Sequence, residues 1–524
     1  MRTRRFAAAA LAGALIAAGG APLELSFLAL LAPGALLLAI EGGGPASGRL
    51  AIALGLTTGL VTNAISMYFI VGLLGRFGGF PFALSLLLAA LLWIAQSLPY
   101  VVAAWMGAAL IRAGARGWLA LPATLTIASS LSPAIFPWHY GLSQLPFLEY
   151  AQVADLGGLP LLDWLVATVG CGLVAALLER RAAPAIAMAA ALVLPPIYGV
   201  VRLVDVRAAR ARAPMVRVGV TQPNVSIEDK HDPRRFLAQL DLLRAQTRAL
   251  EAEGAEVVVW PETSYRFPIL RGATRDREGR LAIRGDGVRG PLIVGVLTTS
   301  GPAHRYFVLD EAGRSAGTFT MAEEERFNSA VLVLPDGRFA GVADKVNLLA
   351  FGEYTPFWEL VPWLQGLPRG ISPGAGRQIL EVGGIRAGIL NCYEDLLAEH
   401  VRTQDAFAPN LWINVTNNAW FGDTSAPHLH HMNARMRAIE TRRDLVRSVN
   451  TGVSGHTAAT GEDLVRTGAF VPATFVAEAR LLEARTLWSR VGDWPTAMLV
   501  GALFGFVLAR RRLTGRRIPR STGA

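Results

Sequence analysis

Long apolar runs with few charged residues dominate about the first 205 residues of the chain. Because the hydrocarbon core of a bilayer takes about 20 residues of α-helix, such runs predict transmembrane helices. They lie near 6–21, 24–41, 51–74, 82–111, 118–137, 160–179 and 183–203, with one more near 494–509. We therefore expect an N-terminal transmembrane bundle of about seven helices over 1–210. A single C-terminal transmembrane helix with a basic cytoplasmic tail is expected over 489–524.

Arginines between the runs predict how the helices cross the membrane, because basic residues are enriched on the cytoplasmic side. They occur at the N-terminus, in the loops after the second, fourth and sixth runs, and in the C-terminal tail. The alternate loops carry only Arg76. Both termini are therefore expected in the cytoplasm, with 214–488 on the outer side. The first run also has the composition of a cleavable signal peptide, an alternative that the sequence leaves open.

The segment 214–488 has the pattern of a soluble α/β domain, in which short β-rich runs alternate with helical ones. Strands are expected at 215–222, 255–262, 291–300, 386–397, 411–420 and 444–451, a hairpin at 328–345, and helices at 232–254 and 427–444. Asp232 is a suitable N-cap and Gly254 a helix stop. Pro261 is expected to end its strand, and Asp336 with the following glycine predicts the hairpin turn.

Composition agrees with a membrane protein. Of the 524 residues, 52% are hydrophobic and 17% charged, below the roughly 25% charged that is usual in soluble domains. The net charge of +10 does not indicate nucleic-acid binding, because the arginines flank apolar runs. Asn63 and Gln96 lie inside runs and are expected to form hydrogen bonds between helices. Two cysteines, Cys171 in an apolar run and Cys392, make no disulfide framework, and Cys171 is expected to be structural.

Three ionisable residues each follow an apolar strand: Glu262, Lys345 and Cys392. Residues just beyond strand ends gather at one edge of an α/β sheet, where such folds place their sites. Together they suit acyl transfer, with the cysteine as nucleophile, the glutamate as base and the lysine as an oxyanion stabiliser. The lysine cation is also expected to lower the pKa of the thiol. Each residue alone has an ordinary explanation, as a buried small side chain, a turn residue or a solvated cation.

Four stretches also resemble a known family: "VVVWPET", "ADKVNLLAFGEYTPF", "GILNCYED" and "INVTNNAWFGDTSAPHLHHMNARMRAIETRRDLVRSVNTGVS". They are similar to the apolipoprotein N-acyltransferases, the membrane branch of the nitrilase (carbon–nitrogen hydrolase) superfamily. The resemblance implies an α/β fold, a nitrilase-like αββα sandwich over 214–488 inserted between transmembrane segments. It also implies that Glu262 is the general base, Lys345 stabilises the oxyanion and Cys392 is the nucleophile.

The resemblance implies further site residues. Glu353, Tyr393 and Glu394 match positions that support the triad in the family. The family has an important tryptophan shortly after the first strand, where this chain has His231, so the substrate contact there differs. Trp420 and Phe421 are either ordinary core residues or contacts to acyl chains.

By the same resemblance, the chain is an enzyme of the bacterial inner membrane with its catalytic domain on the periplasmic side. Its substrates would be a phospholipid acyl donor and a diacylated apolipoprotein acceptor, with no cofactor and no nucleic-acid partner.

Three histidines, His428, His430 and His431, lack carboxylate or cysteine partners at metal spacing, so no metal site is predicted. The alternatives to an acyltransferase are a membrane-tethered amidase or hydrolase and a transporter with an exported accessory domain. The tryptophan-rich stretch 357–368 is expected at the membrane interface, or packed on the sheet.

Overall fold

The computed structural model describes residues 2–309, 314–358, 360 and 370–515. Its chain divides into two compact units. One, here called the helical unit, comprises Met1–Tyr68, Leu86–Val200 and Val491–Ala524; the other, the sheet unit, comprises Phe69–Ser85 and Val201–Arg490. Most of the predicted interfacial segment 357–368 and the end of the predicted tail lie outside the described residues.

The helical unit contains the long apolar helices. All or most of each of these elements belongs to it: α1 (Arg2–Ala18), α2 (Ser26–Glu41), α3 (Gly48–Ser66), α5 (Phe82–Gln96), α6 (Leu98–Arg112), α7 (Gly117–Leu131), η1 (Tyr140–Gln144), α8 (Leu148–Ala151), α9 (Ala154–Glu179), α10 (Ala182–Arg212) and α16 (Trp494–Gly515). Among the described residues, four helical segments are long and apolar enough to cross a membrane: Gly48–Ser66, Phe82–Arg112, Ala154–Glu179 and Ala182–Arg212. The count of seven spans plus one stays a prediction.

One predicted span is wrong as a single helix. The run 51–74 forms α3 and a separate helix, α4 (Phe69–Gly78). Met67 leaves helical geometry at the end of α3, with φ −119° and ψ 29°. Apolar content alone does not mark such a break, because apolar residues continue on both sides of it. Beyond it, α4 belongs to the sheet unit and packs its aromatic side chains there.

Polar side chains of the helical unit bind main-chain groups. Asn63 donates from Nδ2 to the Trp93 carbonyl at 3.2 Å, which joins α3 to α5 and confirms the expected interhelical bond. The corresponding expectation for Gln96 is wrong. Its Nε2 donates to the carbonyl of Phe136 at 2.7 Å, in a non-helical stretch after α7. Cys171 is buried within α9.

The sheet unit is built from two six-stranded sheets. The first has the order β14 (Ala473–Arg480), β1 (Met215–Gln222), β2 (Val257–Leu270), β3 (Leu292–Ser300), β6 (Glu325–Val333) and β7 (Phe339–Asp344). The second has the order β13 (Asp463–Arg466), β12 (Gly455–Thr457), β11 (Leu445–Val449), β10 (Leu411–Thr416), β9 (Ile385–Asn391) and β8 (Ile379–Val382). A separate hairpin joins β4 (Ala303–Leu309) to β5 (Ser315–Ala322). Strands β1, β2 and β3 run parallel, as do β9, β10 and β11.

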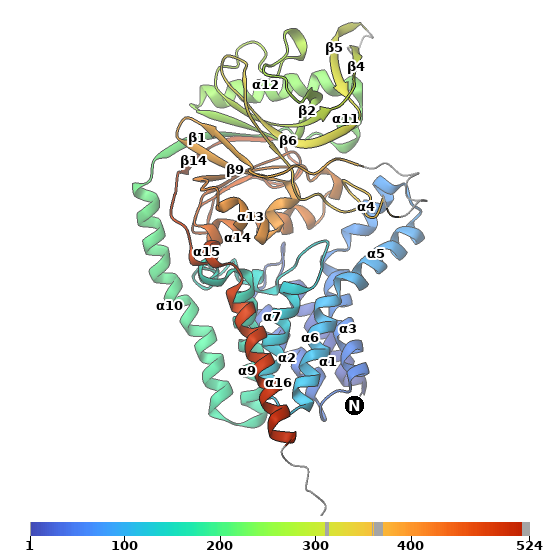
Figure 1. Ribbon diagram of the computed structural model, residues 1–524, viewed down its shortest axis with the longest axis vertical. Coiled ribbons are helices and arrows are strands. Elements are labelled where there is room, and N and C mark those ends of the chain that lie inside the picture. The colour runs from blue at the N-terminus through green and yellow to red at the C-terminus, as the bar shows by residue number, and fades with distance from the viewer. Residues whose placement is uncertain (1, 310–313, 359, 361–369, 516–524) are drawn as a thin grey trace, which may run out of the picture. The chain divides into compact units, whose positions relative to one another are not determined.

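Apolar side chains from both sheets meet in one core, so the two sheets face each other. The other face of the first sheet packs on α12 (Phe236–Ala252). The other face of the second sheet packs on α13 (Ala398–Asp405) and α14 (Ala426–Thr441), as Figure 1 shows. Shorter helices complete the unit: α11 (Ile227–His231), η2 (Pro233–Arg235), η3 (Gly279–Leu281), η5 (Cys392–Leu396), η6 (Ala419–Phe421) and α15 (Leu487–Val491). The layers are therefore α, β, β and α, as the resemblance implies.

Most predicted elements of this unit form, but the strands predicted at 386–397 and 411–420 end early, at Asn391 and Thr416, before the turns η5 and η6. Pro261, in turn, does not end its strand. β2 continues to Leu270, and its pairing with β3 is irregular between Trp260 and Tyr265. Proline has no N–H for the ladder, so the strand leaves its register there and then resumes. Gly295 on β3 admits this detour, because a Cβ at that position would lie 2.1 Å from the Pro261 carbonyl oxygen.

Candidate active site

The structure brings the three predicted residues together in the sheet unit. Glu262 lies in the irregular part of β2, Lys345 directly follows β7, and Cys392 begins η5 directly after β9. Lys345 Nζ lies 3.7 Å from Glu262 Oε1, and the thiol of Cys392 interacts electrostatically with both. Lys345 is 1% exposed and Glu262 6%, whereas Cys392 is half-buried. The charged pair is thus shielded from solvent beside a cysteine residue that is itself only partly exposed.

Two residues at this site adopt left-handed backbone geometry. Cys392 has φ +52°, and Thr263, next to Glu262, has φ +46°. This region costs an L-residue roughly 1–2 kcal/mol and is uncommon for a β-branched residue such as threonine. Strained residues of this kind persist only where surrounding contacts hold them, and they cluster at functional sites. The chain therefore spends conformational energy to orient the thiol and the carboxylate.

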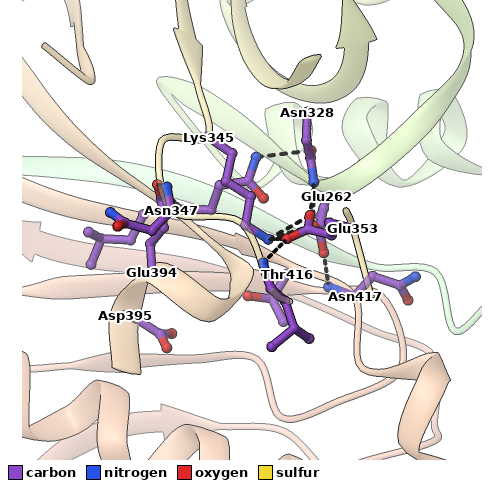
Figure 2. Close-up of polar contacts among 12 residues, drawn as sticks. Glu262, Asn328, Lys345, Asn347, Glu353, Glu394, Asp395, Thr416 and Asn417 are labelled. Atoms are coloured by element: carbon purple, nitrogen blue, oxygen red, sulfur yellow. Dashed lines mark hydrogen bonds and ion pairs between the residues drawn. The ribbon is translucent and has the colours of Figure 1, made fainter. Parts of the chain in front are cut away.

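Neutral donors hold the Glu262 carboxylate. Asn328 Nδ2 donates to Oε1 at 2.6 Å, and the main-chain N–H of Asn417 donates to Oε2 at 2.9 Å. Asn328 Oδ1 in turn accepts from Asn391 Nδ2 at 3.0 Å. Since Asn391 directly precedes Cys392, one amide chain links the carboxylate to the turn that bears the thiol. Figure 2 shows Glu262 and Asn328 pointing toward each other within this group.

The ammonium of Lys345 is held by a second carboxylate. Its Nζ donates to Glu353 Oε1 at 2.8 Å, and Glu353 Oε2 accepts from the Leu349 N–H at 2.8 Å. Burial acts to lower the pKa of Lys345, but the carboxylates of Glu353 and Glu262 outweigh it and raise the pKa above its ordinary value. Lys345 is therefore a fixed cation, the form that an oxyanion stabiliser requires.

The pKa of the Cys392 thiol is shifted in the direction that disfavours its charged form, whereas the shift at Lys345 favours the charged form. Burial raises the pKa of Cys392 well above its ordinary value, the charge of Glu262 raises it further, and Lys345 opposes this only in part. The prediction that the lysine gives a lowered thiol pKa is therefore wrong, because two effects of the opposite sign are larger. A protonated thiol needs a base in place to remove its proton as it attacks. Glu262 is the carboxylate whose charge acts most strongly on this thiol.

Comparisons with known proteins bear on this geometry. A family model described as apolipoprotein N-acyltransferase N-terminal domain matches residues 12–172, and one described as carbon-nitrogen hydrolase matches residues 217–474. The apolipoprotein N-acyltransferase of Geobacter metallireducens is 30% identical, covering 97% of this chain and 96% of the relative. That of Azotobacter vinelandii is also 30% identical, covering 96% and 94%. This chain belongs to the apolipoprotein N-acyltransferase family.

Family membership accounts for the layered fold of the sheet unit, which is nitrilase-like. An amidase of the nitrilase superfamily from Nesterenkonia is 18% identical and covers 51% of this chain and 93% of its own. Its TM-score is 0.35.

In this family member the buried carboxylate of Glu394 connects two segments of the site. Its Oε1 accepts from the N–H groups of Val346 and Asn347 at 2.7 and 3.0 Å, and its Oε2 accepts from the Asn391 N–H at 2.9 Å. One carboxylate thus ties the segment after Lys345 to the turn before Cys392. Figure 2 shows Glu394 beside Asn347.

Tyr393 follows the cysteine and is half-buried. Burial raises the pKa of its hydroxyl to about 12, although the Lys345 cation acts against this. The hydroxyl is therefore neutral in this acyltransferase-family site and is a hydrogen-bond donor at physiological pH.

An aromatic cluster surrounds the loop that follows Asn417. Trp420 lies with its ring centroid 4.7 Å from that of Phe77 and 5.9 Å from that of His231, and Phe421 lies 5.5 Å from Phe69. Trp420 is 37% exposed. The three predicted substrate-contact residues therefore meet, together with α4, whose presence there the sequence did not predict.

The histidines of α14 do not converge. His430 bonds to Asp395 at 2.7 Å, His431 to Asp463 at 2.9 Å, and His428 to the guanidinium of Arg466 at 3.2 Å. Among the residues that the structure describes, no cluster of three or more histidine, cysteine or carboxylate side chains is arranged to hold a metal.

Sequence reasoning missed several residues of the site. Asn328 and Asn417 lie in or just after strands and carry no spacing signal. Asp395, three residues after Cys392, forms a buried ion pair with Arg447 as well as its bond to His430. Lys230 on α11 donates to the main-chain carbonyl of Glu262 at 2.8 Å. A signal for Lys230 was present, because it is one of only two lysines in the chain.

Proposed function

We propose that this protein transfers an acyl chain from a phospholipid to the N-terminal amino group of a diacylglyceryl-cysteine apolipoprotein. A thioester on Cys392 is the intermediate. The observation that carries the proposal is the buried Glu262–Lys345 pair beside the half-buried residue Cys392, in a chain that belongs to the apolipoprotein N-acyltransferase family. Relatives that span nearly the whole chain bear this name, which favours acyl transfer over the hydrolase and transporter alternatives.

In the first half-reaction, the sulfur of Cys392 attacks the ester carbonyl carbon of the phospholipid while Glu262 takes the thiol proton. Lys345 stabilises the oxyanion of the tetrahedral intermediate. Collapse of the intermediate breaks the carbon–oxygen bond. Glu262 returns the proton to the departing lysophospholipid oxygen, and the acyl chain remains on Cys392 as a thioester.

In the second half-reaction, the free α-amino group of the diacylated apolipoprotein attacks the thioester carbonyl. Glu262 accepts the amine proton, and Lys345 again stabilises the oxyanion. Collapse breaks the carbon–sulfur bond, forms the amide and returns the proton to the thiolate of Cys392. The product lipoprotein carries a third acyl chain.

The remaining predicted residues have supporting roles in this proposal. Glu353 keeps Lys345 charged and in place, and Glu394 fixes the turn that presents Cys392. Tyr393 donates its hydroxyl toward the intermediate. We assign the aromatic cluster of Trp420, Phe421 and His231 to contact with the lipid substrates. Trp420, which is partly exposed, is suited to the membrane–water interface, where tryptophan is enriched.

The proposal places the protein in the bacterial inner membrane, with 1–210 and 489–524 as membrane regions and 214–488 as the catalytic domain. Arginine-bearing loops on one side of the predicted spans support a cytoplasmic location for both termini and a periplasmic location for the domain. A site at the membrane surface would receive phospholipid by lateral diffusion. It would also limit hydrolysis of the thioester by keeping water away.

Cysteine labelling tests the proposal. Purified full-length protein is incubated with phospholipid that carries a labelled acyl chain, before any acceptor is added, and the label is located by mass spectrometry. We expect a thioester on Cys392, which is lost in Cys392→Ala and retained in Cys171→Ala, the matched control at the only other cysteine.

Addition of a diacylated lipopeptide should then move the label into an amide on the acceptor. Label released only as free fatty acid would support a hydrolase instead. Absence of acyl label on the wild-type protein would overturn covalent catalysis altogether.

A further inference from the structure

Lysine is almost absent from this chain. Of its 50 lysine and arginine residues only two are lysines, Lys230 and Lys345. Exposed basic positions are therefore filled by arginine throughout. Both lysines are buried, 3% and 1% exposed respectively, and both contact Glu262. Where arginine serves everywhere else, the positions that keep lysine are those that require its compact, titratable head group.

The two lysines approach Glu262 from different elements and bind different parts of it. Lys345, after β7, lies near the carboxylate. Lys230, on α11, donates from Nζ to the main-chain carbonyl oxygen at 2.8 Å. That carbonyl belongs to the peptide that leads into Thr263, the residue with φ +46°. Lys230 therefore restrains the backbone at the strained point from which the Glu262 side chain departs.

The surroundings of Lys230 are unusual for a cation. Burial is the main cause that lowers its pKa, to about 7, and Arg266 on β2 lowers it further, whereas Glu262 and Cys392 act to raise it. A guanidinium at this position would remain charged at every physiological pH and would need more room and more acceptors. The amine of Lys230 can instead change its charge in the working pH range.

We propose that Lys230 is a positioning residue for the general base, holding the Glu262 main chain so that the carboxylate stays directed at Cys392. The inference rests on the function proposed above. It divides the work between the two lysines, because Lys345 stabilises charge on the substrate and Lys230 fixes the base. A misplacement of about 1 Å in a catalytic group can slow a reaction about 10²-fold, so the contribution of such a contact is measurable.

Single-turnover acylation of Cys392 by labelled phospholipid tests this role in the full-length protein. The burst amplitude counts molecules with a competent site, and the first-order rate constant reports the positioning of the base. For Lys230→Met we expect an amplitude near that of wild type. The rate constant should be about 10²-fold lower, and the phospholipid concentration for half-saturation should be unchanged within about twofold. Lys230→Gln keeps an N–H donor and should recover part of the rate, and it is the test if the methionine variant fails to fold.

Gln239 provides a matched control. It lies on α12 and donates from Nε2 to the Asp229 carbonyl at 2.6 Å, so it anchors α11 without touching Glu262. Gln239→Leu should leave the rate constant within about threefold of wild type. If it slows acylation as much as Lys230→Met, Lys230 acts only by holding α11 and the proposal is overturned. A rate constant for Lys230→Met close to that of wild type would also overturn the proposal. If the wild-type protein itself acquires no acyl label on Cys392, the proposed function is overturned instead.

A pH profile gives a second readout. Below about pH 7 the ammonium is present and donates to the Glu262 carbonyl, and as the pH rises through about 7 it becomes a weaker, neutral donor. The wild-type rate constant should therefore decline through a step near pH 7. That step should be absent from Lys230→Met and from Lys230→Arg, whose charge does not titrate. A step that persists in Lys230→Met would belong to another group and would contradict this role.

Discussion

Two buried carboxylates close to Cys392 in sequence or in space have opposite surroundings. Asp395 bonds to His430 at 2.7 Å and forms an ion pair with Arg447. Burial opposes ionisation, but the contacts with His430 and Arg447 lower the pKa of Asp395 below its ordinary value. Glu262 instead accepts from two neutral amides and lies 3.7 Å from the Lys345 ammonium.

The difference indicates which carboxylate is available for chemistry. A carboxylate in an ion pair with a buried arginine is a structural anchor, since taking a proton would leave that guanidinium as an unpaired buried charge. A carboxylate held by neutral donors keeps its orientation when it is protonated. Glu262 can therefore accept and return a proton within the site, while Asp395 holds η5 to α14 and β11.

The largest expected effect is on Glu262. Glu262→Gln keeps the shape and an acceptor oxygen but removes the proton-accepting carboxylate. General-base catalysis contributes about 10²–10⁴-fold, so the rate constant for acylation of Cys392 should fall about 10³-fold with little change in thermal unfolding. Single-turnover labelling measures the first and calorimetry the second. A variant that acylates within tenfold of wild type would transfer the role of base to another group.

The converse effect is expected at Asp395. Asp395→Asn leaves Arg447 as a buried cation without its carboxylate, and breaking a buried ion pair costs about 3–5 kcal/mol. Denaturant unfolding should show that loss, while the acylation rate constant per competent site stays within about tenfold of wild type. If instead the rate collapses and stability is retained, the distinction between the two carboxylates is wrong.

A buried histidine–carboxylate pair allows a test of how stability depends on pH. His431 Nε2 lies 2.9 Å from Asp463 Oδ2, and burial lowers the pKa of His431 to about 4 despite that partner. In the unfolded chain this histidine takes up a proton near the ordinary histidine pKa of 6.5. Between these values the unfolded state binds more protons, so stability decreases as the pH falls from about 6.5 to 4, by at most about 3 kcal/mol.

This contribution should disappear in His431→Phe, which lacks a titrating ring. Unfolding free energies of both proteins, measured from pH 7 down to pH 4.5, would show whether their difference narrows as the pH falls. Parallel curves would assign the acid sensitivity to other groups.

The smallest effect is expected at the surface. Arg207 forms an ion pair with Glu462 at 2.6 Å, and the arginine side chain is 54% exposed. Pairs of this kind contribute about 0–1 kcal/mol, so Arg207→Gln should change the unfolding free energy by less than about 1 kcal/mol and should leave acylation unaltered. A larger change would show that exposure is a poor guide to the cost of losing a charge in this protein.

Strand ends were sufficient to predict Lys345 directly after β7 and Cys392 directly after β9. The expectation of one shared sheet edge is wrong, because β2 and β7 belong to the first sheet and β9 to the second, and Glu262 lies within β2. Other features depend on contacts that no local pattern encodes. Pro261 has the signature of a strand end, yet β2 resumes beyond it since Gly295 on the neighbouring strand leaves room. The catalytic roles of the three residues remain predictions.

The same limit applies to α4 and to the thiol. The break at Met67 lies inside a run of mostly apolar residues. The packing of α4 on Trp420 and Phe421 joins segments more than 300 residues apart in sequence. The pKa of Cys392 depends on burial, which outweighs the one charge that the sequence suggested. The residue types indicated the chemistry of the site, but the direction of the Cys392 pKa shift could be learned only from the packing around the thiol.

The scarcity of lysine also gives the protein a simple peptide map. Complete digestion of the denatured chain at lysine yields three fragments, 1–230, 231–345 and 346–524. Cys171 falls in the first and Cys392 in the last, so a mass increase on either thiol is assigned without sequencing. In the native protein both cleavage points are buried, and the rate at which a lysine-specific protease cuts it would report how often the core of the site opens.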